Sequence, residues 1–202
     1  MSLLLPYETQ ERELVVLGSR FIAVMMPLDD LSQLGECLSW IEERYPKATH
    51  YPYAAKVEAK EKMSDDGEPS RSTGIPLLSL IHQKCVDHIL LCVVRYFGGT
   101  KLGLSRLTRT YREAAGLLLN EGVFAEEIEV EERTVSLSYG DFERLKRKIE
   151  ESDIMMENVE YGISVTLTLL GNDKMISAFL ETAPSAQLIS SKKKKTKRRI
   201  IR

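Results

Sequence analysis

Five cations without acidic neighbours mark the part of the sequence best suited to bind an anion. Residues 88–112 contain no Asp or Glu, although the whole chain has 30 acidic and 28 basic residues. A glycine-rich turn that leads into a helix presents unpaired amides at the positive end of the helix dipole, and glycine permits conformations that a Cβ hinders. The expected anion or nucleic-acid site comprises Arg95, Gly98, Gly99, Lys101, Arg106, Arg109 and Arg112.

A plainer interpretation of the same segment stays open. The glycine pair can serve only to reverse the chain, and arginines on the outer face of an amphipathic helix are usually just solvated. The segment matches neither the phosphate-binding loop G-x-x-x-x-G-K-[ST] nor the dinucleotide fingerprint G-x-G-x-x-G. Anion binding is therefore a hypothesis about amides and cations, without support from a known nucleotide motif.

A second candidate loop, residues 64–74, reads SDDGEPSRSTG and has no large apolar side chain. Its carboxylates suit a hard divalent cation, and its hydroxyls suit an anion at the start of the helix that follows. The alternative is a solvated turn, because Asp, Gly, Pro and Ser are turn formers in their own right. Two such loops, each before a helix, can converge on one ligand. The candidates in and beside this loop are Asp65, Asp66, Glu68, Ser70 and His50.

The histidines favour neither a metal centre nor nucleophilic catalysis. His50, His82 and His88 lack metal-ligand spacing, and no Cys or Ser partner is evident. We expect no metal and no cofactor, and the sequence assigns no catalytic residue.

Hydrophobic patterns predict the elements that hold both loops. The apolar run 89–94 is typical of a buried strand, and we expect a helix with Ser105 as N-cap after the glycine turn. A second helix is expected to begin near Pro76, after the acidic loop. Alternation in residues 49–62 indicates one strand with a wet face. Upstream we expect a loose end over residues 1–10, a hairpin of strands 13–17 and 20–25, and a helix from Asp30 to about Arg44.

The pattern changes near residue 126, where a second domain is expected. Strands and helices follow in the order β-α-β-β-α-β, the ferredoxin-like arrangement. The predicted class is α+β, with an N-terminal domain 1–125, a ferredoxin-like domain 126–190 and a basic tail 191–202. That fold hosts many activities, so it does not decide the function.

The charge distribution and the cysteines indicate which partners and which cellular compartment to expect. Residues 192–202 carry five Lys and three Arg without an acid, whereas the rest of the chain has 20 bases against 30 acids. Such a run suits counterion release on nucleic acid, and equally a disordered solubilising end. Three cysteines without a C-x-x-C pair indicate reduced thiols in a cytoplasmic protein. We expect no secretory signal and no membrane span.

Together the two loops resemble the IMPACT/YigZ family. Its members carry Ser-Asp-Asp-Gly-Glu-Pro-Ser, here residues 64–70, and Arg-Tyr-Phe-Gly-Gly-x-Lys-Leu-Gly, here residues 95–103. These motifs and their neighbours cover residues 19 to about 125, and the second domain matches the bacterial two-domain type more loosely. Two of the family's usual glycines are arginines here, Arg71 and Arg106. Supporting matches are residues 19–23 and 48–50, and Leu107, Arg109 and Tyr111.

The resemblance implies both an architecture and a function. The first domain is expected to look like the second domain of a small-subunit ribosomal protein, and the second like domain V of elongation factor G. Because eukaryotic relatives look like translation regulators, the first hypothesis is a non-enzymatic cytoplasmic regulator of translation or stress response. It would bind RNA, the ribosome or a ribosome-associated protein, as a monomer or small homo-oligomer.

Two rival hypotheses remain. One is an enzyme for a phosphorylated or carboxylated small molecule, with Asp65, Asp66 or Glu68 as metal ligand or acid/base. The other is a pure protein-interaction module. The regulator hypothesis and the enzyme hypothesis both require residues 64–70 and 95–103 to face each other across one pocket.

Overall fold

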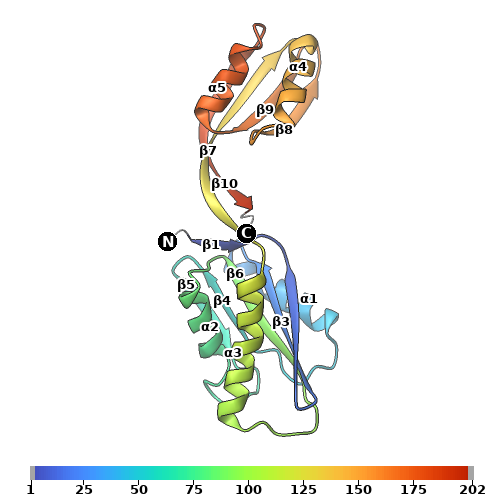
Figure 1. Cartoon of the computed structure of the whole chain (residues 1–202), viewed down its shortest axis with the longest axis vertical. Coiled ribbons are helices and arrows are strands. Elements are labelled where there is room, and N and C mark those ends of the chain that lie inside the picture. Colours follow the sequence, from blue (N-terminus) through green and yellow to red (C-terminus); the bar gives the residue numbers. More distant parts are fainter. Residues whose placement is uncertain (1–2, 200–202) are drawn as a thin grey trace. The chain divides into compact units, whose positions relative to one another are not determined.

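The computed structural model describes residues 3–199, with side chains described up to residue 196. Over that range the chain is a mixed α+β protein with two sheets and five α-helices, which confirms the predicted class (Figure 1). The chain forms two compact units. Within the described residues, the first comprises residues 3–127 and 197–199, and the second comprises Ile128–Thr196. No helix within the described residues is both long and apolar enough to cross a membrane.

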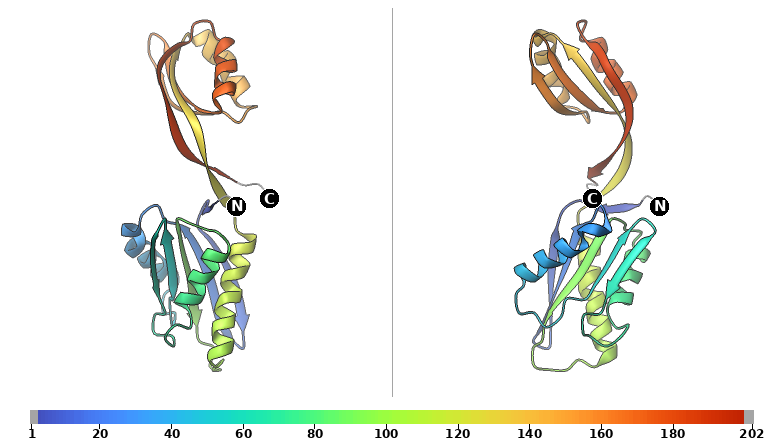
Figure 2. Two further views of the ribbon diagram at one scale, coloured as in Figure 1. Left: turned by 90° about the vertical axis from the view of Figure 1, so that its left-hand side faces the viewer. Right: turned by 180° about the vertical axis from the view of Figure 1, so that it is seen from behind.

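The first unit is built on a five-stranded antiparallel sheet with the order β2-β3-β6-β4-β5. Helices α2 and α3 cover one face of the sheet and α1 covers the other (Figure 2). The elements are β2 (Gln10–Val16), β3 (Ser19–Pro27), α1 (Leu34–Arg44), β4 (Tyr53–Val57), β5 (Lys60–Ser64), α2 (Gly74–Gln83), β6 (Ile89–Tyr96) and α3 (Leu104–Glu121).

The central strand β6 explains the unbroken apolar run in the sequence. Ile89, Leu91 and Val93 pack into the core beneath α2 and α3. Leu90, Cys92 and Val94 pack into the core beneath α1. Because helices cover both faces of the sheet, the strand has no wet side and shows no alternation. The loops at the carboxyl end of β6 and at the starts of α2 and α3 therefore lie on a rigid base.

The single strand expected over residues 49–62 is wrong. Two strands, β4 and β5, form a hairpin instead, with a two-residue turn between Val57 and Lys60. Glu58 takes the left-handed backbone conformation in this turn, with φ of 56°. Asp87, from another part of the chain, accepts a hydrogen bond from the Glu58 amide at 2.8 Å. A tertiary contact therefore stabilises a turn that the local pattern does not signal.

Two further expectations about the ends of elements are also wrong. A loose end is expected over residues 1–10, but β1 (Leu4–Pro6) pairs with the first residues of β7 and Leu5 is buried. Residues 1–2 lie outside the described residues. Helix α3 begins two residues earlier than expected, at Leu104, with Gly103 rather than Ser105 as its N-cap. By contrast, the expected hairpin of β2 and β3 and the Asp30 cap before α1 are both present.

The second unit follows the order β-α-β-β-α-β, with the sheet order β10-β7-β9-β8. Its core lies between the sheet and the two helices and includes Val135, Leu137, Phe142 and Leu167. The elements are β7 (Phe124–Leu137), α4 (Tyr139–Ile149), β8 (Met155–Tyr161), β9 (Val165–Gly171), α5 (Asp173–Glu181) and β10 (Gln187–Arg199).

Most of the basic segment belongs to a strand rather than to a solvated tail. Residues 191–199 form the second part of β10, which pairs with β7. Lys192 and Lys194 contact Glu132 at 2.9 and 3.1 Å, and Lys193 contacts Glu129 at 2.8 Å. The acidic residues of β7 thus offset the charge that had argued against order. The rest of the predicted tail, residues 200–202, lies outside the described residues.

Candidate functional site

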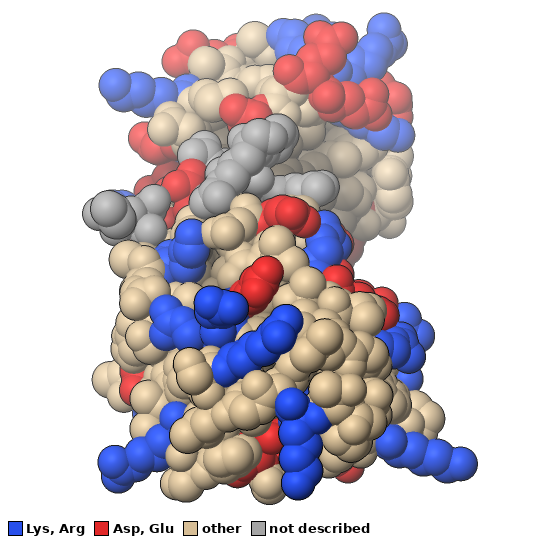
Figure 3. Space-filling view, turned by 60° about the horizontal axis from the view of Figure 1, so that its bottom comes forward, with Lys and Arg blue, Asp and Glu red and all other residues tan. Residues whose placement is uncertain are grey.

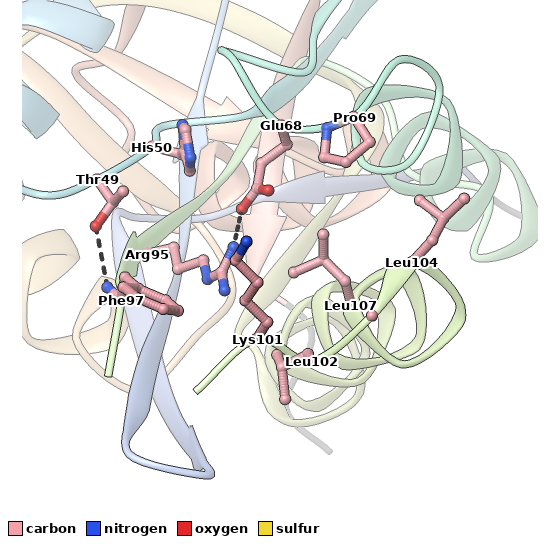
Figure 4. Close-up of a pocket in the computed structure, with 11 residues that line it drawn as sticks. Thr49, His50, Glu68, Pro69, Arg95, Phe97, Lys101, Leu102, Leu104 and Leu107 are labelled. Atoms are coloured by element: carbon pink, nitrogen blue, oxygen red, sulfur yellow. Dashed lines mark hydrogen bonds and ion pairs between the residues drawn. The ribbon is translucent and has the colours of Figure 1, made fainter. Parts of the chain in front are cut away.

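The two candidate loops meet at one pocket of about 350 Å³ at an end of the first unit (Figure 4). The acidic loop leads into α2, and the glycine stretch joins β6 to α3. Both loops contribute to the lining, as the anion-site hypothesis requires. The lining residues are Thr49, His50, Glu68, Pro69, Arg95, Phe97, Lys101, Leu102, Gly103, Leu104 and Leu107.

A buried ion pair joins the loops at the base of the pocket. Arg95 Nη1 lies 2.5 Å from Glu68 Oε1, and the two residues are only 6% and 8% exposed. The Tyr111 hydroxyl donates to the same oxygen at 2.6 Å, and burial together with this bond raises the pKa of Tyr111. The Arg95 guanidinium also lies 5.4 and 5.6 Å from the ring centroids of Phe21 and Phe97. The charge of Arg95 is therefore matched inside the fold.

Asp65 occupies the N-terminus of α2 with the chain's own carboxylate. Its Oδ1 accepts hydrogen bonds from the amides of Thr73 and Gly74, both at 2.9 Å, and from the Thr73 hydroxyl at 2.7 Å. Its Oδ2 accepts from the Arg71 amide at 2.7 Å. Burial on its own raises the pKa of Asp65, but these hydrogen bonds outweigh it and hold the pKa below its usual value. The helix start expected to receive an external anion is already filled.

The carboxylates of the acidic loop point to different partners and do not form a cation site. The Asp66 carboxylate accepts a hydrogen bond from the Tyr51 amide at 2.6 Å, and this partner differs from the partners of Asp65 and Glu68. No group of three or more His, Cys, Asp or Glu within residues 3–199 is placed to hold a metal ion. Ser70 is exposed and does not line the pocket. The divalent-cation interpretation of this loop is therefore not supported by its geometry.

His50 lines the pocket with a defined tautomer. Its Nδ1 lies 2.7 Å from the backbone carbonyl oxygen of Asp66. A carbonyl only accepts, so Nδ1 carries a proton, and in the neutral imidazole Nε2 is an acceptor. The backbone of His50 also pairs with Arg95, which fixes the residue beside the end of β6.

Gly98 and Gly99 serve the chain in different ways. A Cβ on Gly98 would lie 2.0 Å from the carbonyl carbon of Gly18, and the Gly98 amide donates to Ser19 Oγ at 3.1 Å. Gly99 has open space around it but a φ of +87°. The predicted role of these glycines in holding an anion is therefore replaced at Gly98 by close packing against the β2–β3 turn.

The N-terminus of α3 is open, in contrast to that of α2. Gly103 is the N-cap, with φ of 74°, and no side chain caps the first amides. Lys101 is exposed and lines the pocket, while Arg106 and Arg109 are exposed on α3 outside it. No carboxylate of the described residues pairs with any of these three cations. Lys and Arg side chains gather on the end of the first unit that faces the viewer in Figure 3.

The Impact N-terminal domain family model matches residues 17–119, a range that contains both loops and the pocket. The chain belongs to the IMPACT family. It is 30% identical over 169 residues to an IMPACT family member of Haemophilus influenzae, covering 80% of this chain and 81% of the relative. It is 28% identical over 177 residues to the IMPACT family member YvyE of Bacillus subtilis, covering 86% and 82%. The resemblance inferred from the two loops is thus confirmed.

A solved structure titled "Crystal structure of an hypothetical protein" shares the fold of this IMPACT family member. The alignment covers 94% of this chain and 98% of that chain, with a TM-score of 0.61 and 24% sequence identity. At this level of identity the likeness bears on the fold alone.

Of the residues predicted for the site, the pocket of this IMPACT family member brings together His50, Glu68, Arg95 and Lys101. Arg112 is half-buried on α3, outside the lining. Sequence reasoning missed the other lining residues, although each falls in or beside a family motif: Thr49, Pro69, Phe97, Leu102, Gly103, Leu104 and Leu107. Tyr111 is also absent from the predicted site residues, because helical spacing alone cannot signal a buried carboxylate partner.

Proposed function

We propose that this IMPACT family member is a non-enzymatic regulator of translation that binds RNA, free or on the ribosome. The proposal rests on three exposed cations, Lys101, Arg106 and Arg109, which have no carboxylate partner among the described residues. They lie at and after the open N-terminus of α3. Cations that are not neutralised by the fold can neutralise phosphates and release counterions.

The translational and cytoplasmic setting is supported by the family. Its eukaryotic members look like translation regulators, and the three free cysteines are compatible with a reducing compartment. The partner proposed for this setting is RNA itself, either free or as part of the ribosome.

The enzymatic alternative has less support from the site. Its three candidates for metal or acid/base chemistry are already engaged. Asp65 accepts hydrogen bonds within the loop, Asp66 accepts from the Tyr51 amide, and Glu68 pairs with Arg95 of β6. His50 and Lys101 are the other basic side chains at the pocket, and no Ser or Cys is among the lining residues to act with them. A positioned nucleophile and base are what covalent catalysis would need.

Binding of a fluorescent single-stranded RNA, measured by anisotropy between about 50 and 200 mM salt, tests the proposal. The logarithm of the association constant should fall linearly with the logarithm of salt concentration. Lys101→Ala and Arg109→Ala should each weaken binding and reduce the slope by about 0.7, the value for one phosphate of a single strand. Lys62→Ala is the matched control, because Lys62 is exposed on β5 and lies outside the pocket lining.

Two outcomes would remove the proposal. One is wild-type protein that fails to bind RNA or ribosomes at low salt. The other is binding that does not respond to salt, since phosphate contacts must respond.

A further inference from the structure

The pocket beside the cations has walls that phosphate binding alone does not explain. Phe97, Leu102, Leu104 and Leu107 form an apolar lining, although Phe97 and Leu104 are 45% and 59% exposed. An apolar hollow with a few polar groups is the usual form of a small-molecule site. A surface that bound only the RNA backbone would gain nothing from these residues.

We propose that the pocket takes one unstacked nucleobase, with the attached phosphate at Lys101 and the first amides of α3. This inference rests on the proposed function and specifies the ligand of the same site. The volume of about 350 Å³ is near the lower end of ligand sites, roughly 300–1,000 Å³, so it suits one planar group. The nucleotide can belong to a single strand or be free, and the chemistry of recognition is the same.

Phe97 supplies the stacking surface. Its ring centroid lies 5.6 Å from Arg95 Cζ, and the residue lines the pocket and is 45% exposed. Its amide donates to Thr49 Oγ1 at 3.0 Å, which fixes the backbone that carries the ring. Aromatic side chains held in this way stack bases of any type, because every base has a π face.

Polar groups at the base of the pocket suit the edge of a base. Arg95 is 94% buried and lines the pocket, and its Nε has no hydrogen-bond partner within the described residues. A buried donor without a partner is unfavourable, and the Arg95 side chain that carries this donor is part of the pocket lining. Thr49 Oγ1 already accepts from Phe97, which leaves its hydroxyl proton to donate, and His50 Nε2 is an acceptor. Figure 4 shows the Arg95 guanidinium among the lining residues, next to Glu68.

The phosphate position follows from the open helix start. Gly103 leaves the first amides of α3 without a side-chain cap, and Lys101 stands at the same rim. Amides at a helix N-terminus together with an ammonium group favour a phosphate over a neutral group. The base and its phosphate would thus use the two kinds of surface that the pocket combines.

The test compares a single-stranded RNA with a duplex of equal length, using the full chain and anisotropy at fixed salt. Wild-type protein should prefer the single strand, and Phe97→Ala should weaken single-strand binding about tenfold without changing duplex binding or the salt slope. Trp40→Ala is the control, because Trp40 is 41% exposed on α1, across the sheet. Leu104→Ala should also weaken single-strand binding, whereas Leu117→Ala, further along α3, should not.

Competition by free nucleoside 5′-monophosphates and by inorganic phosphate separates the sources of the ligand. Competition by the monophosphate that Phe97→Ala abolishes supports the pocket with a free nucleotide. Single-strand preference without such competition supports the pocket with a nucleotide of a strand. Inorganic phosphate that competes as well as the monophosphate would overturn base recognition.

The remaining outcomes keep this inference distinct from the proposed function. Suppose that RNA binding depends on salt, but that the affinity is the same for single strand and duplex and is unchanged by Phe97→Ala. That result would overturn the pocket inference and leave the proposed function standing. Monophosphate binding by a protein that binds no RNA would support the pocket inference and overturn the proposed function.

Discussion

The acidic loop before α2 and the glycine stretch before α3 both lead into a helix N-terminus, but only the acidic loop supplies an acceptor for the first amides of its helix. At α2 the Asp65 carboxylate accepts from the first amides. At α3 Gly103 brings no side chain, and the helix start faces the pocket. A helix N-terminus is therefore available to a ligand only where the chain does not supply its own anion.

The strongest way to break this arrangement is to remove the contact between the two loops. Arg95→Met leaves the Glu68 carboxylate buried, with the Tyr111 hydroxyl as its remaining partner. We expect a loss of about 3–5 kcal/mol in the free energy of unfolding, measured by urea denaturation, because an unpaired buried charge is costly. Combining Arg95→Met with Glu68→Gln should restore part of the loss. A single variant as stable as wild type would contradict the role of the pair.

The glycine stretch can be tested at adjacent residues that need glycine for different reasons. Gly98→Ala places a Cβ 2.0 Å from the Gly18 backbone, which cannot yield without opening the β2–β3 turn. We expect a loss of about 3 kcal/mol, the upper part of the usual range for overpacking. Gly99→Ala meets no atom but is held at φ of +87°, so about 1–2 kcal/mol is expected. Thermal unfolding of both variants should rank them in this order, and the reverse ranking would refute the packing role of Gly98.

Removing the internal anion of the acidic loop should have a pH-dependent effect. Asp65→Asn exchanges charge-assisted hydrogen bonds for neutral ones, so we expect a loss of about 1–2 kcal/mol at neutral pH. The folded-state pKa of Asp65 lies below its unfolded value, so its stabilisation is complete above the unfolded pKa and is lost as the pH falls through the folded pKa. Urea denaturation should therefore show a constant gap between variant and wild type above about pH 5, narrowing below about pH 4. A gap that widens toward acid would exclude this explanation.

At the open helix start, stability and binding should separate. Lys101 is exposed and has no carboxylate partner among the described residues, so Lys101→Ala should change the free energy of unfolding by no more than about 0.5 kcal/mol. The same variant should lose RNA affinity, as described above. Parallel denaturation and anisotropy measurements check both, and a large loss of stability would show that Lys101 is structural, like Asp65.

Much of the secondary structure could be predicted because it follows from local patterns. The apolar run of β6, the apolar face of α3 and the Asp30 cap each depend on residues that are close together in the sequence. The β4–β5 hairpin could not be predicted, since the Glu58 turn is held by Asp87 from a distant segment. The continuation of β10 through the basic segment was missed for a similar reason, because the lysines of this segment pair with Glu129 and Glu132 of β7.

The sequence by itself determined the α+β class, the family and the two loops that matter, because residue types and short-range spacing carry that information. Only the tertiary structure decided which groups remain free to bind. It paired Arg95 with Glu68, turned Asp65 back onto α2, and left Lys101 and the start of α3 open. The physical reason is that a charge is available to a ligand only when no opposite charge reaches it, and that depends on residues distant in the chain.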